Sequence, residues 1–415
     1  MMGGCPAHSR PYTTQVGPRA DRGRSRIGLT VSVVLSAAIA CHAGGDSTRD
    51  TVTEGAGVIG VDHVVPATPE NLSWGWFPID KEPVITVRPG EVVEIHTLTG
   101  LGASGDLDPV TNLGEIGIAA SDVPQELIAF WKTHTTRSRA GRNGHLITGP
   151  VYVEGAEPGD VMEVQILDVR PKVRWGVNFT RARSGVLSDA YPGYREGDAP
   201  LDIPPDAPDR EPEDFHIIRT VTAEGRDYGV WASGVRVPLA PFMGILAVAP
   251  DLSTESYGVD VPGVRRSGPP GRFGGNLDVK HLTAGTSLFL PVSHPGARFY
   301  VGDPHFAQGD GEICGTAIEA SLDVHLRLSL ADDPPVTAPL LQYDGQWFTH
   351  GFGSDLDTAM RMAAAQMLDL LVARGGFTRD EAYSLASVAV DLGVTQVVDG
   401  TVGCHAAVTE ALLAR

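Results

Sequence analysis

An alternation of apolar and polar residues constrains the fold of this chain more than any other feature. Between residues 321 and 330, leucine or valine occupies every second position, and Asp323, His325 and Arg327 stand between them. Successive side chains of a β-strand point to opposite faces, so this pattern predicts a half-buried strand. Residues 161–169 alternate in a similar way. Fifty glycines and 31 prolines supply the turns that a protein of many short strands needs.

Two Pro-Gly-acid turns each stand between strand-like apolar runs. The first separates residues 84–87 from 92–96, and the second separates 151–153 from 161–169. Proline and glycine set the backbone angles of tight turns, so each unit predicts a β-hairpin. The two units therefore predict related β-elements, although no strict sequence repeat joins them.

The C-terminal part of the chain changes character. Apolar residues recur near helical spacing between residues 355 and 374, and Gly375 follows as a stop signal. Thr378 and Glu381 match a capping box, which predicts a second helix ending near Leu392. The sequence therefore predicts a mainly β fold with a C-terminal α/β portion: β-sandwich or barrel-like units that carry a helical layer near the C-terminus.

These patterns divide the chain into four regions. We expect a signal peptide at 1–40, a flexible tether at 41–60, a β-rich region at 61–330, and an α/β portion of the same domain at 331–415. Within the β-rich region, residues 188–214 are rich in proline and acidic residues. Proline cannot donate a hydrogen bond to a sheet, so this stretch predicts a surface loop.

The N-terminal region has the pattern of a targeting segment. Four arginines between residues 19 and 26 precede an apolar run over 27–40, which is typical of an export signal. The run ends in Ala38-Ile39-Ala40-Cys41, which resembles the lipobox of bacterial lipoproteins, with Ala38 where leucine is usual. We therefore expect an exported protein. It is either free in the periplasm after ordinary cleavage or anchored to the membrane only through lipid on Cys41.

Charge and cysteine content limit the partners and covalent links. The chain has 32 Lys and Arg against 51 Asp and Glu, a formal net charge of −19. Such a surface repels nucleic acid and anionic lipid headgroups, so neither is an expected partner. Beyond the N-terminal region, only Cys314 and Cys404 occur. In an oxidising compartment they form a disulfide or remain two separate thiols, and the sequence favours neither.

A Gly-rich stretch at 302–312 holds the densest group of reactive side chains. Asp303, His305, Asp310 and Glu312 fall within it. Carboxylate and imidazole together are a ligand set for zinc or another divalent ion. An acidic, solvated hairpin with His305 as a turn residue is the alternative, and the spacing alone leaves both open. The Gly-x-Ser-x-Gly motif of serine hydrolases is absent from the sequence, so covalent catalysis has no support.

Five segments, in this order, resemble the acetamidase/formamidase family: 144–160, 241–244, 274–278, 302–312 and 315–319. The similarity extends over roughly residues 60–405. The resemblance implies a β-rich fold, a homo-oligomer, and hydrolysis of a small linear amide to a carboxylate and ammonia. It also implies a divalent metal, with Zn²⁺ as the first expectation and Ca²⁺ as the second.

Carried onto this sequence, the resemblance implies a role for each matching residue. The expected metal ligands are Asp278, Asp303 and His305, and the expected catalytic residues are Glu312 as general base and His145. The expected substrate-binding residues are Asn276 and Gln308, with Glu319 in support and the backbone N–H groups near Gly309 and Gly311 as oxyanion donors. Two alternatives stay open: hydrolysis of another C–N bond (in a carbamate, a urea-like compound or a cyclic amide), and a non-catalytic binding lipoprotein stabilised by metal.

Overall fold

A computed structural model describes residues 59–103, 107–134, 144–180, 185–187, 214–254, 264–332 and 336–413. The expected signal peptide, Cys41 and the tether as far as residue 58 lie outside these ranges, and so does the acidic Pro-rich stretch as far as residue 213. Residues 58–415 form one compact unit. Among the helices that the structure describes, none is long and apolar enough to cross a membrane.

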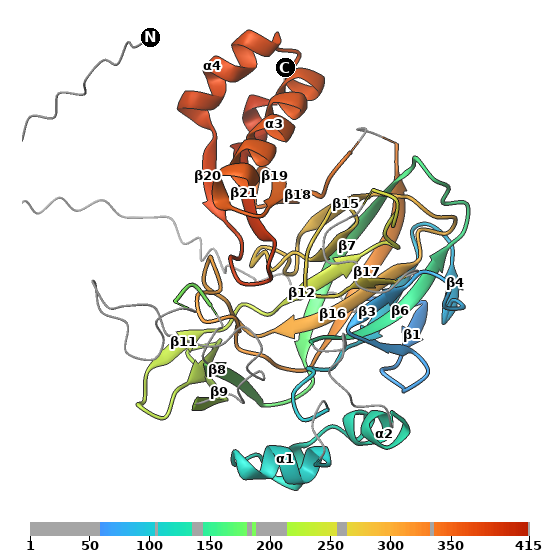
Figure 1. The fold of residues 1–415 in the computed structure, drawn as a ribbon, viewed down its shortest axis with the longest axis vertical. Helices are drawn as coiled ribbons and strands as arrows, with labels where there is room; N and C mark the ends of the chain where they lie inside the picture. The colour runs from blue at the N-terminus through green and yellow to red at the C-terminus, as the bar shows by residue number, and fades with distance from the viewer. Residues whose placement is uncertain are drawn as a thin grey trace, which may run out of the picture. The chain divides into compact units, whose positions relative to one another are not determined.

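Two large sheets dominate this unit (Figure 1). The nine-stranded sheet has the order β1 (His63–Val65), β5 (Val92–His96), β17 (Leu322–Ala331), β7 (Val161–Pro171), β15 (Ser287–Pro291), β18 (Leu340–Tyr343), β19 (Gln346–Gly353), β21 (Val402–Thr409) and β20 (Asp391–Val394). The six-stranded sheet has the order β14 (Gly274–Asn276), β12 (Phe242–Ala247), β16 (Phe299–His305), β6 (Leu146–Val153) and β2 (Leu72–Trp74), with β4 (Ile85–Val87) also paired to β6.

Smaller elements complete the fold. A four-stranded sheet has the order β11 (Arg236–Pro238), β10 (Arg226–Val230), β9 (Asp214–Ala223) and β8 (Trp175–Thr180), and a two-stranded sheet joins β13 (Val264–Arg266) to β3 (Trp76–Pro78). The helices are α1 (Pro109–Glu115), α2 (Gln125–Thr133), α3 (Leu356–Gly375) and α4 (Arg379–Ala389), with 3₁₀ turns η1 (Ala120–Asp122) and η2 (Glu410–Leu412). The predicted mainly β class is confirmed.

The main core lies between the two large sheets. Apolar side chains of both sheets, such as Val324 and Leu326 of β17 and Ile245 of β12, belong to one buried cluster. The alternation predicted for 321–330 appears in β17, where Leu322, Val324 and Leu326 are buried and Asp323 is partly exposed. A sheet with one apolar face must bury it against another layer, which explains the sandwich.

The predicted C-terminal helical layer is also present. Helix α3 packs on β19 and β21 over a second apolar cluster that includes Ala363, Met367 and Leu371 (Figure 1). Thr378 and Glu381 form the reciprocal capping box that begins α4. Helix α4 ends at Ala389, however, and not near Leu392, because the chain there enters β20 and pairs with β21.

The predicted hairpins are wrong in their pairing, although their strands exist. Strand β4 pairs in parallel with β6, whereas β5 pairs with β1 and β17 in the other sheet. The second unit behaves in the same way, since β6 and β7 also lie in different sheets. Each Pro-Gly-acid turn therefore carries the chain from the six-stranded to the nine-stranded sheet. Burial of the apolar face of each strand between the two sheets outweighs local pairing across the turn.

The structure settles the cysteine question in favour of two separate thiols. Neither the partly buried Cys314 nor the buried Cys404 is in a disulfide. Cys404 lies on the face of β21 that packs against α3, with its Sγ 4.0 Å from the Leu356 carbonyl oxygen. Cys314 instead lies beside Asn178 on β8, whose Nδ2 is 3.3 Å from the thiol.

Candidate functional site

Strand β12 brings the predicted metal ligands together. It lies between β14, which leads into Asp278, and β16, which carries Asp303 and His305. In the register, Ile245 of β12 is opposite both Asn276 and Gly302. Gly244 leaves room for the acids: a Cβ at this position would lie 2.5 Å from Asp278 Oδ1 and 2.5 Å from Asp303 Oδ2.

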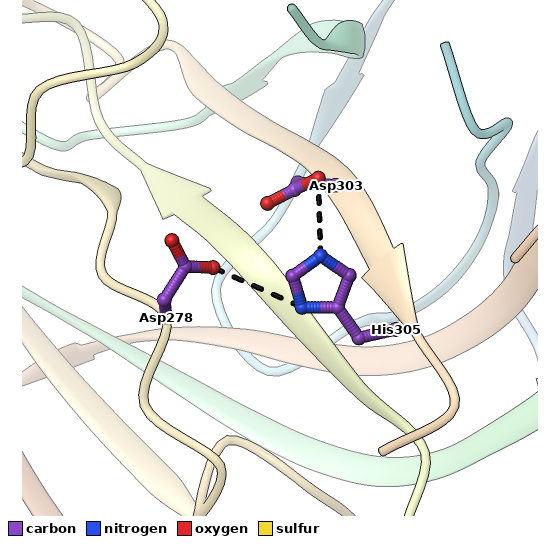
Figure 2. Close-up of side chains that lie close together, drawn as sticks. All are labelled: Asp278, Asp303 and His305. Atoms are coloured by element: carbon purple, nitrogen blue, oxygen red, sulfur yellow. Dashed lines mark ion pairs between the residues drawn. The ribbon is translucent and has the colours of Figure 1, made fainter. Parts of the chain in front are cut away.

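His305 is the centre of the group and is only 1% exposed. Its Nδ1 lies 3.8 Å from Asp278 Oδ1, and its Nε2 lies 3.3 Å from Asp303 Oδ1 (Figure 2). The same Nε2 is 3.3 Å from Glu319 Oε1. The two ring nitrogens therefore face different carboxylates, and the imidazole is enclosed by three acids.

The backbone is strained at three acidic residues of this region of the structure. Among the described non-glycine residues, seven have a positive φ, and they include Asp278 (45°), Asp303 (52°) and Glu312 (48°). This left-handed region costs an ordinary residue about 1–3 kcal/mol, and such residues gather at functional sites. The neighbouring structure therefore holds these carboxylates in positions that local preference would not choose.

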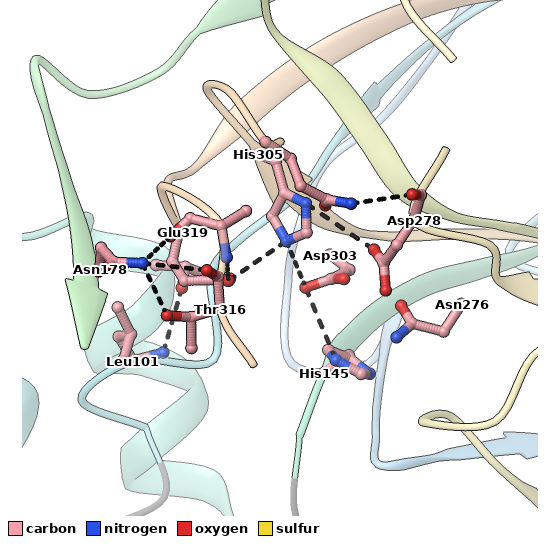
Figure 3. A network of polar contacts seen from close by, with 12 residues as sticks. Leu101, His145, Asn178, Asn276, Asp278, Asp303, His305, Thr316 and Glu319 are labelled. Atoms are coloured by element: carbon pink, nitrogen blue, oxygen red, sulfur yellow. Dashed lines mark hydrogen bonds and ion pairs between the residues drawn. The ribbon is translucent and has the colours of Figure 1, made fainter. Parts of the chain in front are cut away.

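His145 and Glu319 approach the cluster from two other segments. His145 precedes β6, and its Nε2 is 3.7 Å from Asp303 Oδ1 (Figure 3). Its Nδ1 is 3.1 Å from the Ser267 hydroxyl. The backbone of Glu319 forms isolated antiparallel β-bridges with His305 and with Val177. This backbone pairing fixes the position of Glu319 beside the cluster. The structure thus brings together four separate stretches of sequence at one point.

Asp399 is a member of the site that the sequence analysis missed. It lies between β20 and β21, and its Oδ2 accepts a 3.0 Å hydrogen bond from Asn276 Nδ2, 123 residues away. Gln396 fixes the loop, because its Oε1 accepts hydrogen bonds from the backbone N–H groups of Val398 (2.8 Å) and Asp399 (3.2 Å). The available signal was the acid–glycine pair Asp399-Gly400 directly after Val397-Val398, which resembles the other Gly-rich acidic turns.

These side chains line a cavity of about 340 Å³. Its acidic wall consists of Asp278, Asp303, Glu312, Glu319 and Asp399. The remaining lining includes His145, Asn276, Thr99, Leu101, Phe179 and Arg266. His305 is buried and does not line this cavity. The lining therefore combines five carboxylates with neutral and basic side chains.

Two predicted participants lie elsewhere. Gln308 lines a neighbouring cavity of about 650 Å³, and its Nε2 donates a 2.9 Å hydrogen bond to the Asp278 backbone oxygen. It is therefore placed to hold Asp278 in position. The Gly311 N–H already donates to the Thr395 oxygen at 2.9 Å, and Gly309 lines the neighbouring cavity. The Gly311 backbone thus anchors the C-terminal loop, and the role of these two glycines as oxyanion donors stays a prediction.

Burial and mutual repulsion raise the pKa of three acids. Burial, followed by the Glu312, Asp303 and Asp399 carboxylates, raises the pKa of Asp278 well above its usual value. Burial, followed by the Asp399 carboxylate, does the same to the pKa of Glu312. Burial also raises the pKa of Asp399 to about 6. Low-dielectric surroundings and like charges both disfavour the ionised carboxylate.

Around His305, the neighbouring charges outweigh the effect of burial on the pKa. Burial disfavours its imidazolium, yet the Asp303 and Glu319 carboxylates raise the pKa of His305 well above its usual value. Burial pushes the pKa of Asp303 upward, but His145 and His305 outweigh it and leave the pKa below its usual value. The polar group is therefore tightly coupled, as expected where a proton or a cation is exchanged.

The predicted ligands suit a divalent cation. In the part of the chain that the structure describes, Asp278, Asp303 and His305 each offer a ligand atom within 4.8 Å of the others. Both carboxylate oxygens of Asp278 and both ring nitrogens of His305 are buried without a hydrogen-bond partner. Buried polar atoms are nearly always satisfied, so these four atoms indicate a missing partner. Carboxylate and imidazole are common zinc ligands.

Fold and site together define a class of protein. The chain is a β-sandwich protein whose cavity carries a buried carboxylate–imidazole group suited to a divalent cation. A model of the acetamidase/formamidase family matches residues 136–257 and 254–411, so the chain belongs to this family.

Known relatives support this assignment. A putative formamidase of Schizosaccharomyces pombe is 33% identical over 216 residues, which are 45% of this chain and 52% of that protein. A formamidase of Methylophilus methylotrophus is 32% identical over 227 residues, 46% of this chain and 52% of that protein. The chain thus spans about half the length of these relatives. A crystal structure described as a predicted acetamidase/formamidase from Thermoanaerobacter tengcongensis shares the fold, with a TM-score of 0.64, 21% identity, and coverage of 85% of this chain and 96% of that one.

Proposed function

We propose that this protein is an exported, metal-dependent amidohydrolase that converts a small linear amide to a carboxylate and ammonia. The observation that carries the proposal is the buried group of Asp278, Asp303 and His305 beside Glu312 in the cavity wall. Family membership supports amide hydrolysis, and the formamidase names of the relatives point to short amides.

Asp278, Asp303 and His305 would hold the metal. A bound divalent ion polarises an amide carbonyl and lowers the pKa of water to about 7. Glu312 is 7% exposed and lines the cavity, so it is placed to take a proton from the attacking water and to pass it to the leaving nitrogen. Burial and the neighbouring Asp399 carboxylate raise the pKa of Glu312, which makes this carboxylate a stronger base than an exposed glutamate.

Two further residues position the substrate. The Nδ2 of Asn276 is used by Asp399, but its Oδ1 is buried without a partner in a residue that lines the cavity. This oxygen would accept an N–H from the amide. His145 shares the cavity wall and lies against Asp303, so it would hydrogen-bond the substrate or support that ligand.

The decisive experiment measures metal and turnover together. Full-length protein is assayed by elemental analysis and by ammonia release from formamide and acetamide, before and after chelation. We expect Asp278→Ala and His305→Ala to lose metal and turnover. Full metal occupancy in both variants, or unchanged turnover after complete chelation, would contradict the proposed metal site. Metal binding with no turnover of any amide would favour the binding-protein alternative.

Hydrolysis of a bulkier C–N substrate is the second candidate. A cavity of about 340 Å³ lies within the range of sites for larger ligands and exceeds what a one- or two-carbon amide fills. A panel that adds longer amides, carbamates and cyclic amides to formamide and acetamide distinguishes the two. The ratio of kcat/KM values between the sets decides which substrate class the cavity fits.

Export and assembly complete the proposal. The arginine-rich start, the apolar run and the small residues before Cys41 support export followed by lipid attachment at that cysteine. The −19 net charge supports an enzyme without nucleic-acid partners. We also propose a homo-oligomer, which light scattering after gel filtration measures directly.

A further inference from the structure

We propose that the cavity binds a second divalent cation, held by the carboxylates of Asp278, Glu312 and Asp399. This ion would lie next to the one held by His305, and Asp278 would be shared by the two. The first ion rests on the proposed function, whereas the second rests on the observations below. Asp399, from the C-terminal loop, is the residue that makes the second ion binding site distinct.

The three carboxylates have the spacing of a coordination shell. Asp278, Glu312 and Asp399 each offer one oxygen, and these oxygens all lie within 4.8 Å of one another. Oxygens bound to one Ca²⁺ at 2.3–2.6 Å lie at most about 5 Å apart, so a single ion between them reaches all three. Glu312 uses one oxygen in this arrangement, and its second oxygen remains free for proton transfer.

A second observation points to a ligand and not merely to an acidic patch. Asp278 is 1% exposed, and neither of its carboxylate oxygens has a hydrogen-bond partner. The Asp278 carboxyl nevertheless has a carboxylate oxygen of Asp303, of Glu312 and of Asp399 within 4.8 Å. Buried acids in mutual contact need either shared protons or a cation between them.

The charge of the cavity lining favours bound cations over shared protons. The cavity lining carries five carboxylates and one guanidinium, that of Arg266. With neutral imidazoles, the lining has a net charge of minus four when the acids are ionised. One divalent ion leaves half of that charge uncompensated in a largely buried wall, whereas two divalent ions cancel it. Buried charge is costly unless it is paired, so the lining is complementary to two ions.

The loop around Asp399 is built to present its carboxylate. Asn276 Nδ2 donates to Asp399 Oδ2 at 3.0 Å, and Gln396 holds the backbone N–H of Asp399 at 3.2 Å. Gln396 is itself fixed, because its Nε2 donates to the Thr401 oxygen at 2.6 Å. Hydrogen bonds that orient a ligand carboxylate are a regular feature of metal sites, and their loss weakens binding 10- to 100-fold.

The ligand types differ between the two positions. The second position offers carboxylate oxygens alone, which suit hard cations such as Ca²⁺, Mg²⁺ or Mn²⁺. The first position includes the His305 imidazole and suits Zn²⁺ as well. Mn²⁺ binds both oxygen and imidazole ligands, so it is the probe of choice for counting the ions.

The test counts ions and needs no turnover, so failure of the amidase proposal would not affect it. Full-length protein is stripped by chelation, dialysed against Mn²⁺, and analysed for bound manganese, with electron paramagnetic resonance to detect coupling between neighbouring ions. We expect two Mn²⁺ per chain with a coupled signal. Asp399→Asn and His305→Gln should each lower the count to one. The matched control is Asp310→Asn, an exposed acid paired with Lys280 at 2.7 Å, which should keep two.

Two results would overturn the proposal. One Mn²⁺ per wild-type chain would show that a single ion uses the whole group, or that protons are shared among the acids. Two Mn²⁺ in folded Asp399→Asn would remove Asp399 from the site. If that variant does not fold, Asn276→Ala decides, since it should weaken one of the two ions 10- to 100-fold and leave the other unchanged. Equal, unchanged affinities for both ions in this variant would also overturn it.

Discussion

Replacing Gly244 by alanine tests whether the close approach of β12 sets the geometry of the metal ligands. Gly244 is buried, and its φ is not in the left-handed region, so alanine adds no backbone strain there. The added Cβ would lie 2.5 Å from both Asp278 Oδ1 and Asp303 Oδ2. It would also lie 3.0 Å from the Asp303 backbone oxygen, so the effects of the substitution should come from one methyl group that meets two carboxylates and this carbonyl.

The size of the displacement follows from the contact distances. Ordinary van der Waals contact begins near 3.4 Å, so each oxygen must retreat by about 0.9 Å from its 2.5 Å position. Metal–ligand distances vary by only about 0.2 Å in well-formed sites, so a shift of this size disrupts coordination. A misplacement of about 1 Å also costs on the order of 100-fold in rate. Overpacking of the strand should lower the free energy of unfolding by about 1–3 kcal/mol.

The assay compares metal content, ammonia release and urea denaturation for Gly244→Ala and a matched Gly309→Ala. Gly309 lies in the adjacent loop, has no atom within 4 Å of an added Cβ, and is exposed. We expect Gly309→Ala to match the wild type and Gly244→Ala to lose metal and about 100-fold in rate while remaining folded. Wild-type metal content and rate in Gly244→Ala would refute the reasoning, because the carboxylates would then not be where the structure has them.

Three further predictions address the general base Glu312, the buried His350 and the N-terminus. Glu312→Gln should keep the fold and the metal at His305 but lower ammonia release by about 100-fold or more, and a wild-type rate would remove Glu312 from the mechanism. Burial lowers the pKa of His350 to about 3, so its unfolded form gains a proton below about pH 6.5 while the folded form does not. The contribution of His350 to stability should therefore be intact above pH 6.5 and fall by about 2 kcal/mol at pH 5. Urea titrations of His350→Asn should show a loss of stability between pH 7 and pH 5 that is about 2 kcal/mol smaller than that of the wild type, and an equal loss would contradict the prediction. Mass spectrometry of the mature protein should find a lipid-modified Cys41 as the first residue, and an unmodified Cys41 or a different start would contradict lipid attachment.

Local patterns predicted the elements because their physical causes are local. The alternation of β17 and the capping box of Thr378 and Glu381 depend on neighbours within a few residues, and both appear as predicted. Strand pairing does not depend on neighbours alone. The Pro-Gly-acid turns looked like hairpins, yet β4 and β5 lie in different sheets, because each strand pairs where the sandwich buries it.

The residues of the site also fall into those that local sequence patterns predicted and one that they did not. Asp303, His305 and Glu312 were found because acids and an imidazole fall close together in a Gly-rich stretch, and Asp278 because it ends a similar turn. Asp399 escaped notice because it reaches the cavity only through the β20–β21 loop and a hydrogen bond from Asn276, 123 residues away.

The sequence by itself determined several of the strands, the two C-terminal helices, and which residues have the chemistry to bind a cation or move a proton. Only the tertiary structure decided which strands pair and which five carboxylates share one cavity wall. The physical reason is the range of the interactions. Backbone preference and side-chain periodicity act over a few residues, whereas burial of a sheet face and repulsion between acids depend on segments that meet only in the folded chain.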